Sequence, residues 1–275
     1  MNLDDLWDFG DPAASEKRFR EALAAGSFDE AQTKTQLARS LTLQKRFEEA
    51  QVVLDEVSRS LPQGDSVARA RLLLEQGRVF RSSGNPEKGL PLFHEAAELS
   101  ARLGEGGFEI DALHMVALAD DPAKSEHWNR VAIERAEASN DPRARKWLGS
   151  LNNNLGWSLF DRGALVEALE AFNKALQARH EQGNPEQIRI AEWCVARILR
   201  ELGRNEEAFA IHLRHFEQDP DSTYGNEELA LLYEIKGENS KAKDHAARAL
   251  NAMEADPYDE FPPERQAKLA SLAAG

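Results

Sequence analysis

The chain has 275 residues, of which 41% are hydrophobic and 30% charged, a composition that favours a folded globular protein and excludes disorder over most of its length. Its 48 acidic residues outnumber its 34 basic ones, and the formal net charge of −14 argues against a nucleic-acid partner because it repels phosphate backbones. A single cysteine, Cys194, excludes an internal disulfide, and no run reaches the roughly 18 apolar residues that a membrane-spanning helix needs.

Helix boundaries are marked along the whole chain by polar residues before proline and by glycines. Asp or Asn directly before proline supplies an N-cap acceptor and a proline suited to the first turn. Five such pairs begin at Asp11, Asn85, Asp121, Asp141 and Asn184. Ser27 followed by Glu30 predicts a capping box. Glycines typical of helix ends stand at Gly26, Gly84, Gly163, Gly183, Gly203 and Gly237.

Five blocks of helical period repeat one pattern of small residues in chain order. Each first helix carries a small residue, at Ala38, Gly77, Gly156, Ala196 and Ala230. Twelve positions further along, each second helix carries another, at Ala50, Gly89, Ala168, Ala208 and Ala242. Small side chains let two antiparallel helices cross closely while large neighbours such as Phe93 and Phe172 interdigitate. The pattern predicts a stack of helix pairs and no strand.

The fourth of the predicted units carries a motif with a family resemblance. Leu155 and Gly156, with Ala168 and Phe172 further on, resemble the tetratricopeptide motif. The whole chain is similar to a group of bacterial tetratricopeptide-repeat (TPR) proteins with units of roughly 39–40 residues. The resemblance implies an all-α, right-handed superhelical solenoid of antiparallel helix pairs, with about six units plus capping helices. It also implies protein or peptide binding and carries over no enzymatic activity.

The predicted organisation has three parts and two irregular places. We expect an N-terminal segment and capping helix in 1–26, the repeats in 27–255, and a linker with a C-terminal capping helix in 256–275. Trp128 stands where the third unit should have a small residue, and Pro91 is expected to kink or delay its helix because it lacks a backbone donor. The first residues hold no basic or apolar leader, so a cytoplasmic protein is expected.

The first helices of stacked pairs line a concave surface, and one stripe of each helix faces it. The stripe consists of the residue after each small residue and those four before and three after it. The candidate groove residues, most of them on this stripe, are Arg39, Arg78, Arg81, Asn153, Asn154, Trp157, Trp193, Arg197 and Arg200. In the sixth unit the stripe holds Glu227, Leu231 and Glu234.

These residue types favour one kind of partner. Five arginines on an inner surface reverse the sign of the overall charge, and guanidinium forks suit carboxylates and phosphates. Trp157 and Trp193 offer flat apolar area, and Asn153 with Asn154 suits a peptide backbone. The sequence therefore predicts a scaffold for an acidic or carboxylate-bearing peptide segment of a protein partner, with no cofactor and no nucleic-acid or membrane partner.

Two other interpretations stay open. The arginines and tryptophans can serve the fold instead, by pairing with neighbouring glutamates and by filling contacts between units. The glutamates within reach are Glu75, Glu192 and Glu201. The protein can also be a sensor that binds a small molecule or signalling peptide in a pocket where the repeat pattern breaks. The residues around that pocket would be His114, Trp128, Asn153 and Trp157.

Catalytic and metal sites have weak support in the sequence. His212 and His215 share one helix face, and His245 or Asp244 could add a third zinc ligand, but no established zinc spacing accompanies them. Cys194 has no recognisable base beside it, and a lone cysteine on a helix is usually a small buried hydrophobe. We therefore predict no enzyme and no metal.

Overall fold

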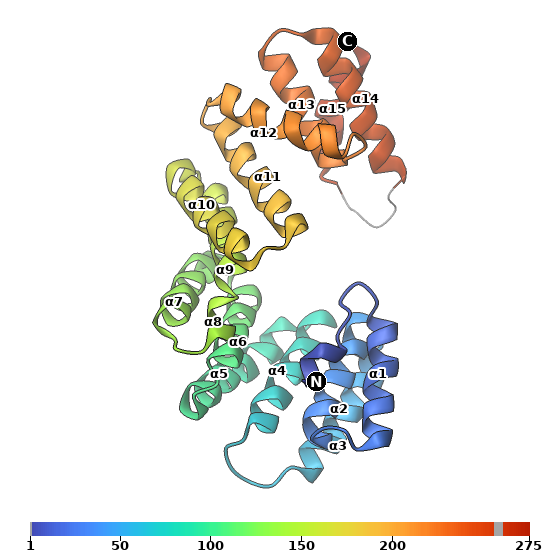
Figure 1. The fold of residues 1–275 in the computed structure, drawn as a ribbon, viewed down its shortest axis with the longest axis vertical. Helices are drawn as coiled ribbons and strands as arrows, with labels where there is room; N and C mark the ends of the chain where they lie inside the picture. Colours follow the sequence, from blue (N-terminus) through green and yellow to red (C-terminus); the bar gives the residue numbers. More distant parts are fainter. Residues whose placement is uncertain (1, 256–260) are drawn as a thin grey trace. The chain divides into compact units, whose positions relative to one another are not determined.

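The computed structural model describes residues 2–255 and 261–275 of the chain. The linker predicted at the start of 256–275 therefore lies largely outside the described residues. Two compact units divide the chain, unit 1 with residues 1–151 and unit 2 with residues 152–275. Every regular element within the described ranges is a helix, as the sequence predicted (Figure 1). None of these described helices is both long and apolar enough to cross a membrane.

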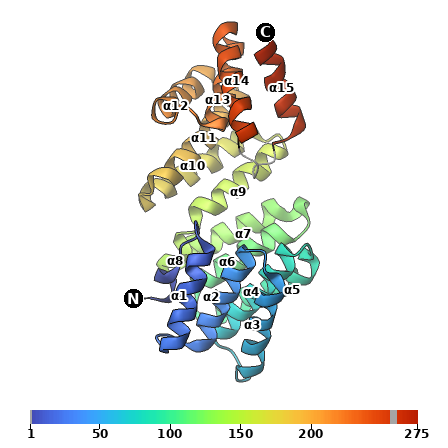
Figure 2. The same cartoon turned by 90° about the vertical axis from the view of Figure 1, so that its right-hand side faces the viewer.

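Unit 1 is a stack of antiparallel helix pairs. Its elements are η1 (Leu3–Leu6), α1 (Pro12–Ala25), α2 (Glu30–Leu43), α3 (Phe47–Ser60), α4 (Val67–Ser82), α5 (Pro86–Leu103), α6 (Gly106–Ala119), η2 (Pro122–Lys124), α7 (Ser125–Ala138) and α8 (Pro142–Arg145). The pairs are α2 with α3, α4 with α5, and α6 with α7. The first helices α2, α4 and α6 lie side by side (Figure 2) and present one common layer.

Unit 2 continues the same construction. The next helix, α9 (Leu148–Asp161), begins in the last residues of unit 1. The others are α10 (Leu165–Gln182), α11 (Pro185–Glu201), α12 (Asn205–Gln218), α13 (Thr223–Ile235), α14 (Asn239–Ala255) and α15 (Pro263–Ala274). α11 pairs with α12 and α13 with α14, while α15 packs against α14 and α13 (Figure 1).

Most of the predicted helix boundaries are confirmed. All six glycines at helix ends have positive φ, between 61° and 85°, where residues with a Cβ are strained. Asp11, Asp121, Asp141 and Asn184 accept hydrogen bonds from backbone N–H groups of the first turn. Asn85 precedes its helix but makes no side-chain cap. The capping box at Ser27 is wrong, since α2 begins after Asp29, whose carboxylate caps Gln32 N–H at 2.8 Å.

Close helix crossings explain the small residues of the repeat. A Cβ added to Gly77 would lie 2.5 Å from the ring of the fully buried Phe93. A Cβ on Gly156 would lie 2.7 Å from the ring of Phe172, which is equally buried. Glycine on the first helix therefore makes room for the phenylalanine of the second, as the sequence pattern predicted.

We expect Gly156→Ala to lower the free energy of unfolding of unit 2 by about 1–3 kcal/mol, because the new methyl group overpacks the Phe172 ring. The helix propensity of alanine opposes this by only about 1 kcal/mol. Urea denaturation followed by tryptophan fluorescence measures the change. In a Phe172→Leu background the same alanine should cost nothing, since the ring is gone. Equal stability of Gly156→Ala and the parent chain would contradict this packing.

The structure explains the irregular third unit, in which Trp128 stands where a small residue was expected. Ala132 in α7 is fully buried where the first, second and fourth units have Leu or Phe, and the large residue Trp128 stands four positions earlier. The Trp128 indole donates to Asp120 Oδ2 at 2.8 Å and contacts the rings of His94 and His127. In the third unit the large residue, Trp128, and the small residue, Ala132, have thus exchanged positions.

Pro91 lies on the exposed side of α5, which begins at Pro86, so the expected delay of this helix is wrong.

Candidate functional site

An arginine on α11 lies among three aromatic rings of unit 2. The guanidinium of Arg197 is 5.7 Å from the ring of Trp157, 5.8 Å from Phe160 and 5.5 Å from Trp193. Arg197 Nε is buried and has no hydrogen-bond partner among the described residues. Within the described part of the chain its ion contact is with Glu228 Oε1 at 3.9 Å, which is beyond hydrogen-bond distance. We call Trp157, Phe160, Trp193 and Arg197 the aromatic-arginine cluster.

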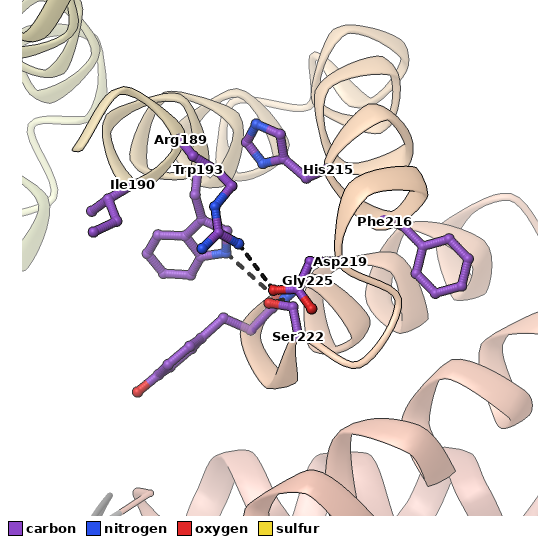
Figure 3. A pocket seen from close by; sticks show the side chains of 9 residues that line it. Arg189, Ile190, Trp193, His215, Phe216, Asp219, Ser222 and Gly225 are labelled. Carbon is purple, nitrogen blue, oxygen red and sulfur yellow. Dashed lines mark hydrogen bonds and ion pairs between the residues drawn. The ribbon is translucent and has the colours of Figure 1, made fainter. Parts of the chain in front are cut away.

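A cavity of about 470 Å³ adjoins this cluster through Trp193 (Figure 3). Its lining residues are Arg189, Ile190, Trp193, His215, Phe216, Asp219, Ser222, Tyr224 and Gly225. Figure 3 shows the Trp193 indole beside the ion pair of Arg189 and Asp219, whose charged atoms are 3.0 Å apart. The Trp193 indole N–H donates to the Tyr224 carbonyl at 3.4 Å. The sequence prediction missed the other lining residues because the turn between α12 and α13 supplies several of them.

Trp157 also serves the fold. Its ring contacts Phe160 at 5.6 Å and the buried Phe172 at 5.1 Å, and Trp193 lies 6.1 Å away. Part of the Trp157 ring therefore fills space between helices, as the structural interpretation of the sequence expected. Both tryptophans remain half-buried, so each also keeps an accessible face.

Arg200 is committed to a buried carboxylate. It donates from Nε to Glu228 Oε2 at 2.6 Å and from Nη2 to Oε1 at 3.2 Å, and Glu201 lies 3.1 Å away. The Glu228 side chain is only 1% exposed. Because two of its N–H groups donate to one buried carboxylate, Arg200 serves the fold more than it serves ligand binding. Of the glutamates considered from sequence, Glu192 pairs with Arg214 and His215 instead.

The asparagines and the cysteine lie together on neighbouring helices. The Cys194 thiol donates weakly to Asn153 Oδ1 at 3.5 Å. Burial raises the pKa of Cys194 to about 12, so the thiol stays protonated at neutral pH. This pKa argues against a nucleophilic cysteine. Asn154 is half-buried on α9, one position from Asn153.

The expected stripe of the sixth unit is covered by the C-terminal helix. Arg265 of α15 donates through both Nε and Nη2 to Glu227, and Lys268 donates to Glu234 at 2.7 Å. Leu269 of α15 is buried. The prediction that Glu227 and Glu234 face an open groove is therefore wrong, because α15 supplies the cations that pair with them.

The arginines of unit 1 have unequal surroundings. Arg78 is buried and donates to Glu75 at 2.5 Å and to Asp111. Within the described ranges Arg39 has no hydrogen bond within 3.5 Å, and it lies 3.9 and 4.0 Å from the same two carboxylates. Burial opposes ionisation of Asp111, but Arg78 and Arg39 outweigh it and hold the pKa of this carboxyl below its usual value. Arg81, half-buried at the end of α4, donates to the Leu118 carbonyl at 3.4 Å.

The zinc hypothesis has no geometric support in the described ranges. No group of three histidine, cysteine or acidic side chains there is arranged to hold a metal ion. His215 Nε2 pairs with Glu192 at 2.8 Å, and His245 Nδ1 pairs with Asn226 at 2.8 Å. Burial first, and then the nearby His215 and Arg200, lower the pKa of His212 to about 3.

The pocket residues of the sensor hypothesis within unit 1 belong to separate clusters. His114 contacts the ring of Trp147 at 5.2 Å. Trp128 packs instead with the core around Phe93 and Met115. The structure thus does not bring His114 and Trp128 to one pocket, because the exchange of sizes in α7 turns the indole toward α5.

Comparisons with known proteins support the fold. No protein-family model matches the chain, and no curated protein matches its sequence. The apo form of RapI resembles it with a TM-score of 0.74 at 12% identity, over 99% of this chain and 80% of RapI. The apo quorum sensor NprR from B. thuringiensis gives 0.58 at 12% identity, over 96% and 83%. A tetratricopeptide repeat protein from Parabacteroides merdae gives 0.53 at 16% identity, over 99% and 96%. The chain therefore has the tetratricopeptide-type fold that its sequence predicted.

Proposed function

We propose that the protein is a binding scaffold that holds an acidic or carboxylate-bearing peptide segment on unit 2. The observation that carries the proposal is the aromatic-arginine cluster, in which Arg197 keeps hydrogen-bond capacity beside an apolar cavity. A guanidinium with unused donors gains most from a carboxylate, because both partners are then satisfied. The flat rings around it exclude water and strengthen that pair.

The cavity beside Trp193 supplies a second contact. Its volume of about 470 Å³ suits a bulky apolar side chain of the same peptide. A carboxylate at Arg197 and an apolar side chain in the cavity would fix a peptide at two points, and Asn154 would bind its backbone. In this proposal Arg78 and Arg200 hold buried carboxylates instead of the peptide. Arg39 and Arg81 belong to unit 1 and are not part of the peptide site.

Peptide selection followed by calorimetry tests this assignment. The full chain is used to select peptides from a random library, and the best binder is remade with Asn and Gln replacing Asp and Glu and with an amidated C-terminus. We expect Arg197→Gln to weaken binding of the original peptide about tenfold or more, as removal of one charge-assisted hydrogen bond does.

Arg214→Gln is the matched control, since Arg214 lies on α12 with a side chain 49% exposed and outside the cluster. This variant should bind as the parent does. Equal affinity of Arg197→Gln for the peptide, or equal binding of the neutral and acidic peptides, would refute the proposal. Failure to select any peptide would refute it as well.

A sensor is the second candidate function. NprR, one of the similar solved structures, is a quorum sensor. The specific feature of this chain that favours ligand sensing is a charged cavity in unit 1, built from helices α2, α4 and α6 together with the N-terminal segment.

A further inference from the structure

Unit 1 contains a cavity of about 450 Å³ that the peptide proposal does not use. Its lining residues include members of α2, α4 and α6. Its polar walls are Asp4, Gln36, Arg39, Arg71, Glu75, Asp111, Arg143 and Lys146. Its apolar walls include Trp7, Phe9, Leu74, Phe108 and Trp147.

Cations predominate around this cavity although the chain as a whole is strongly acidic. Four lining residues are Arg or Lys and three are Asp or Glu. The buried Arg78 donates hydrogen bonds to two of those carboxylates. Because Glu75 and Asp111 are hydrogen-bonded by Arg78, they leave Arg39 incompletely satisfied, whereas Arg143 is paired with Glu105 and Asp141. The incompletely satisfied donors of Arg39 and Arg71 therefore favour an anion.

Two arginines keep unused donors at this cavity. The Arg71 side chain is 7% exposed, its Nε has no hydrogen-bond partner, and its ion partner Asp4 is 52% exposed. Arg39 is 24% exposed and makes no hydrogen bond within 3.5 Å. Its guanidinium lies 5.6 Å from the Trp7 ring and 5.4 Å from the Phe9 ring. Buried donors without partners are costly, so a carboxylate that meets both groups is stabilised.

The cavity also offers an acceptor and flat apolar walls. Glu75 Oε2 is buried without a hydrogen-bond partner, although Oε1 of the same carboxylate accepts from Arg78. An N–H group of a ligand would satisfy it. Phe108, stacked under Arg71 at 4.5 Å, and Trp147 provide apolar surface for a side chain.

The N-terminal segment forms one wall of the cavity. Trp7 donates from its indole to Gln36 Oε1 at 2.9 Å and stacks on Phe9 with ring centroids 4.7 Å apart. Leu3 and Leu6 hold the segment in the core of unit 1. Phe9 itself is 62% exposed, so it covers the site without being fixed in the core.

We propose that this cavity binds a small molecule with a carboxylate beside an N–H donor and an apolar side chain. Arg39 and Arg71 would bind the carboxylate, Glu75 the N–H group, and the aromatic walls the side chain. A free α-amino acid and the C-terminal residue of a peptide share this chemistry. The site is independent of the peptide surface proposed for unit 2.

Calorimetry on the full chain with three probes tests the chemistry. L-Phenylalanine has the carboxylate and a free ammonium, N-acetyl-L-phenylalanine keeps the carboxylate and an amide N–H, and L-phenylalaninamide lacks the carboxylate. We expect saturable binding of at least one of the first two and at least about tenfold weaker binding of the amide. Tighter binding of phenylalanine identifies a free amino acid, and equal or tighter binding of the acetyl form identifies a peptide terminus. No binding of any probe, or equal binding of the amide, overturns the proposal.

Variants locate the site. Arg39→Gln should weaken binding of the best probe about tenfold or more, and Arg39→Lys, which keeps the charge but loses the fork, should be intermediate. Arg102→Gln is the matched control on α5, where Arg102 pairs with Asp65 at a side-chain exposure of 55%. Arg39→Gln removes two long ion contacts but no hydrogen bond within the described residues, and thermal melting checks that the fold stays intact. Unchanged affinity of Arg39→Gln overturns the assignment, and unchanged small-molecule binding by Arg197→Gln separates this site from the one in unit 2.

Discussion

Replacing Arg200 with methionine is expected to lower the free energy of unfolding of unit 2 by about 3–5 kcal/mol, the usual cost of breaking a buried ion pair from one side. Glu228 is buried and receives two hydrogen bonds from Arg200. Neither Arg197, at 3.9 Å, nor the uncharged His212 is placed to replace them. Urea denaturation of the full chain, followed by tryptophan fluorescence and circular dichroism, measures the loss.

A second substitution separates the ion pair from simple loss of packing. Arg200→Met with Glu228→Leu should recover most of the lost stability, since apolar side chains of similar volume often replace a buried pair without cost. Arg204→Met is the exposed control, because Arg204 is 47% exposed and pairs with Glu207, which is 57% exposed. Its cost should stay below about 1 kcal/mol. A loss for Arg200→Met no larger than for this control would show that the Glu228 pair does not stabilise the fold.

The contrast between paired and unpaired arginines decides how the inner surface works. Arg78 and Arg200 each meet buried carboxylates with short hydrogen bonds, whereas Arg39 and Arg197 lie among aromatic rings at 5.4–5.8 Å. The first kind stabilises the helix stack, and we propose that the second keeps donors for a ligand. On this proposal, ligands bind at a particular arginine in each unit and not along a continuous basic stripe.

The fold could be predicted because its signals are local. Helix period, proline after Asp or Asn, and glycine at positive φ each act within one or two turns. The pairing of Gly156 with Phe172 also follows from a fixed spacing inside one repeat, so the sequence contains it directly. Where a local signal had a competitor, as at Ser27 against Asp29, the stronger carboxylate acceptor became the cap.

The site could be predicted only in part because its partners are distant in sequence. Arg78 meets Asp111 across 33 positions and Arg200 meets Glu228 across 28, and nothing in the repeat pattern specifies which carboxylate is in reach. Trp157, Trp193 and Arg197 were found because they lie on the stripe that the repeat geometry defines. The cavity beside Trp193 was missed because Asp219 and Ser222 come from an irregular turn.

The second prediction with a large expected effect concerns His212, which should make the free energy of unfolding depend on pH. Both ring nitrogens of this fully buried histidine lack hydrogen-bond partners among the residues that the structure describes. The groups that face it are Glu228 at 3.9 Å, His215 and Arg200. Burial, the largest cause, lowers the pKa of His212 to about 3, against 6.5 for an unperturbed histidine. Between these two values the unfolded chain binds a proton that the folded chain does not.

The stability contributed by a neutral His212 should therefore be complete above about pH 6.5 and decline as the pH falls toward 3. The expected slope is about 1.4 kcal/mol per pH unit, or about 2 kcal/mol between pH 6.5 and 5. His212→Leu removes the titrating ring without breaking a hydrogen bond, so it should flatten the slope and be at least as stable as the parent at pH 7. Urea denaturation between pH 5 and 7 measures both quantities.

The control for this slope is His180→Gln, which changes an exposed histidine on α10 and should leave the pH dependence of the parent unchanged. Working above about pH 5 keeps most carboxylates ionised in both states, so the measured slope reports histidines. If His212→Leu retains the slope of the parent, the proton uptake on unfolding belongs to other groups. If it unfolds more readily at pH 7, the ring makes a contact that the described geometry lacks, and the neutral, unpartnered state of His212 is refuted.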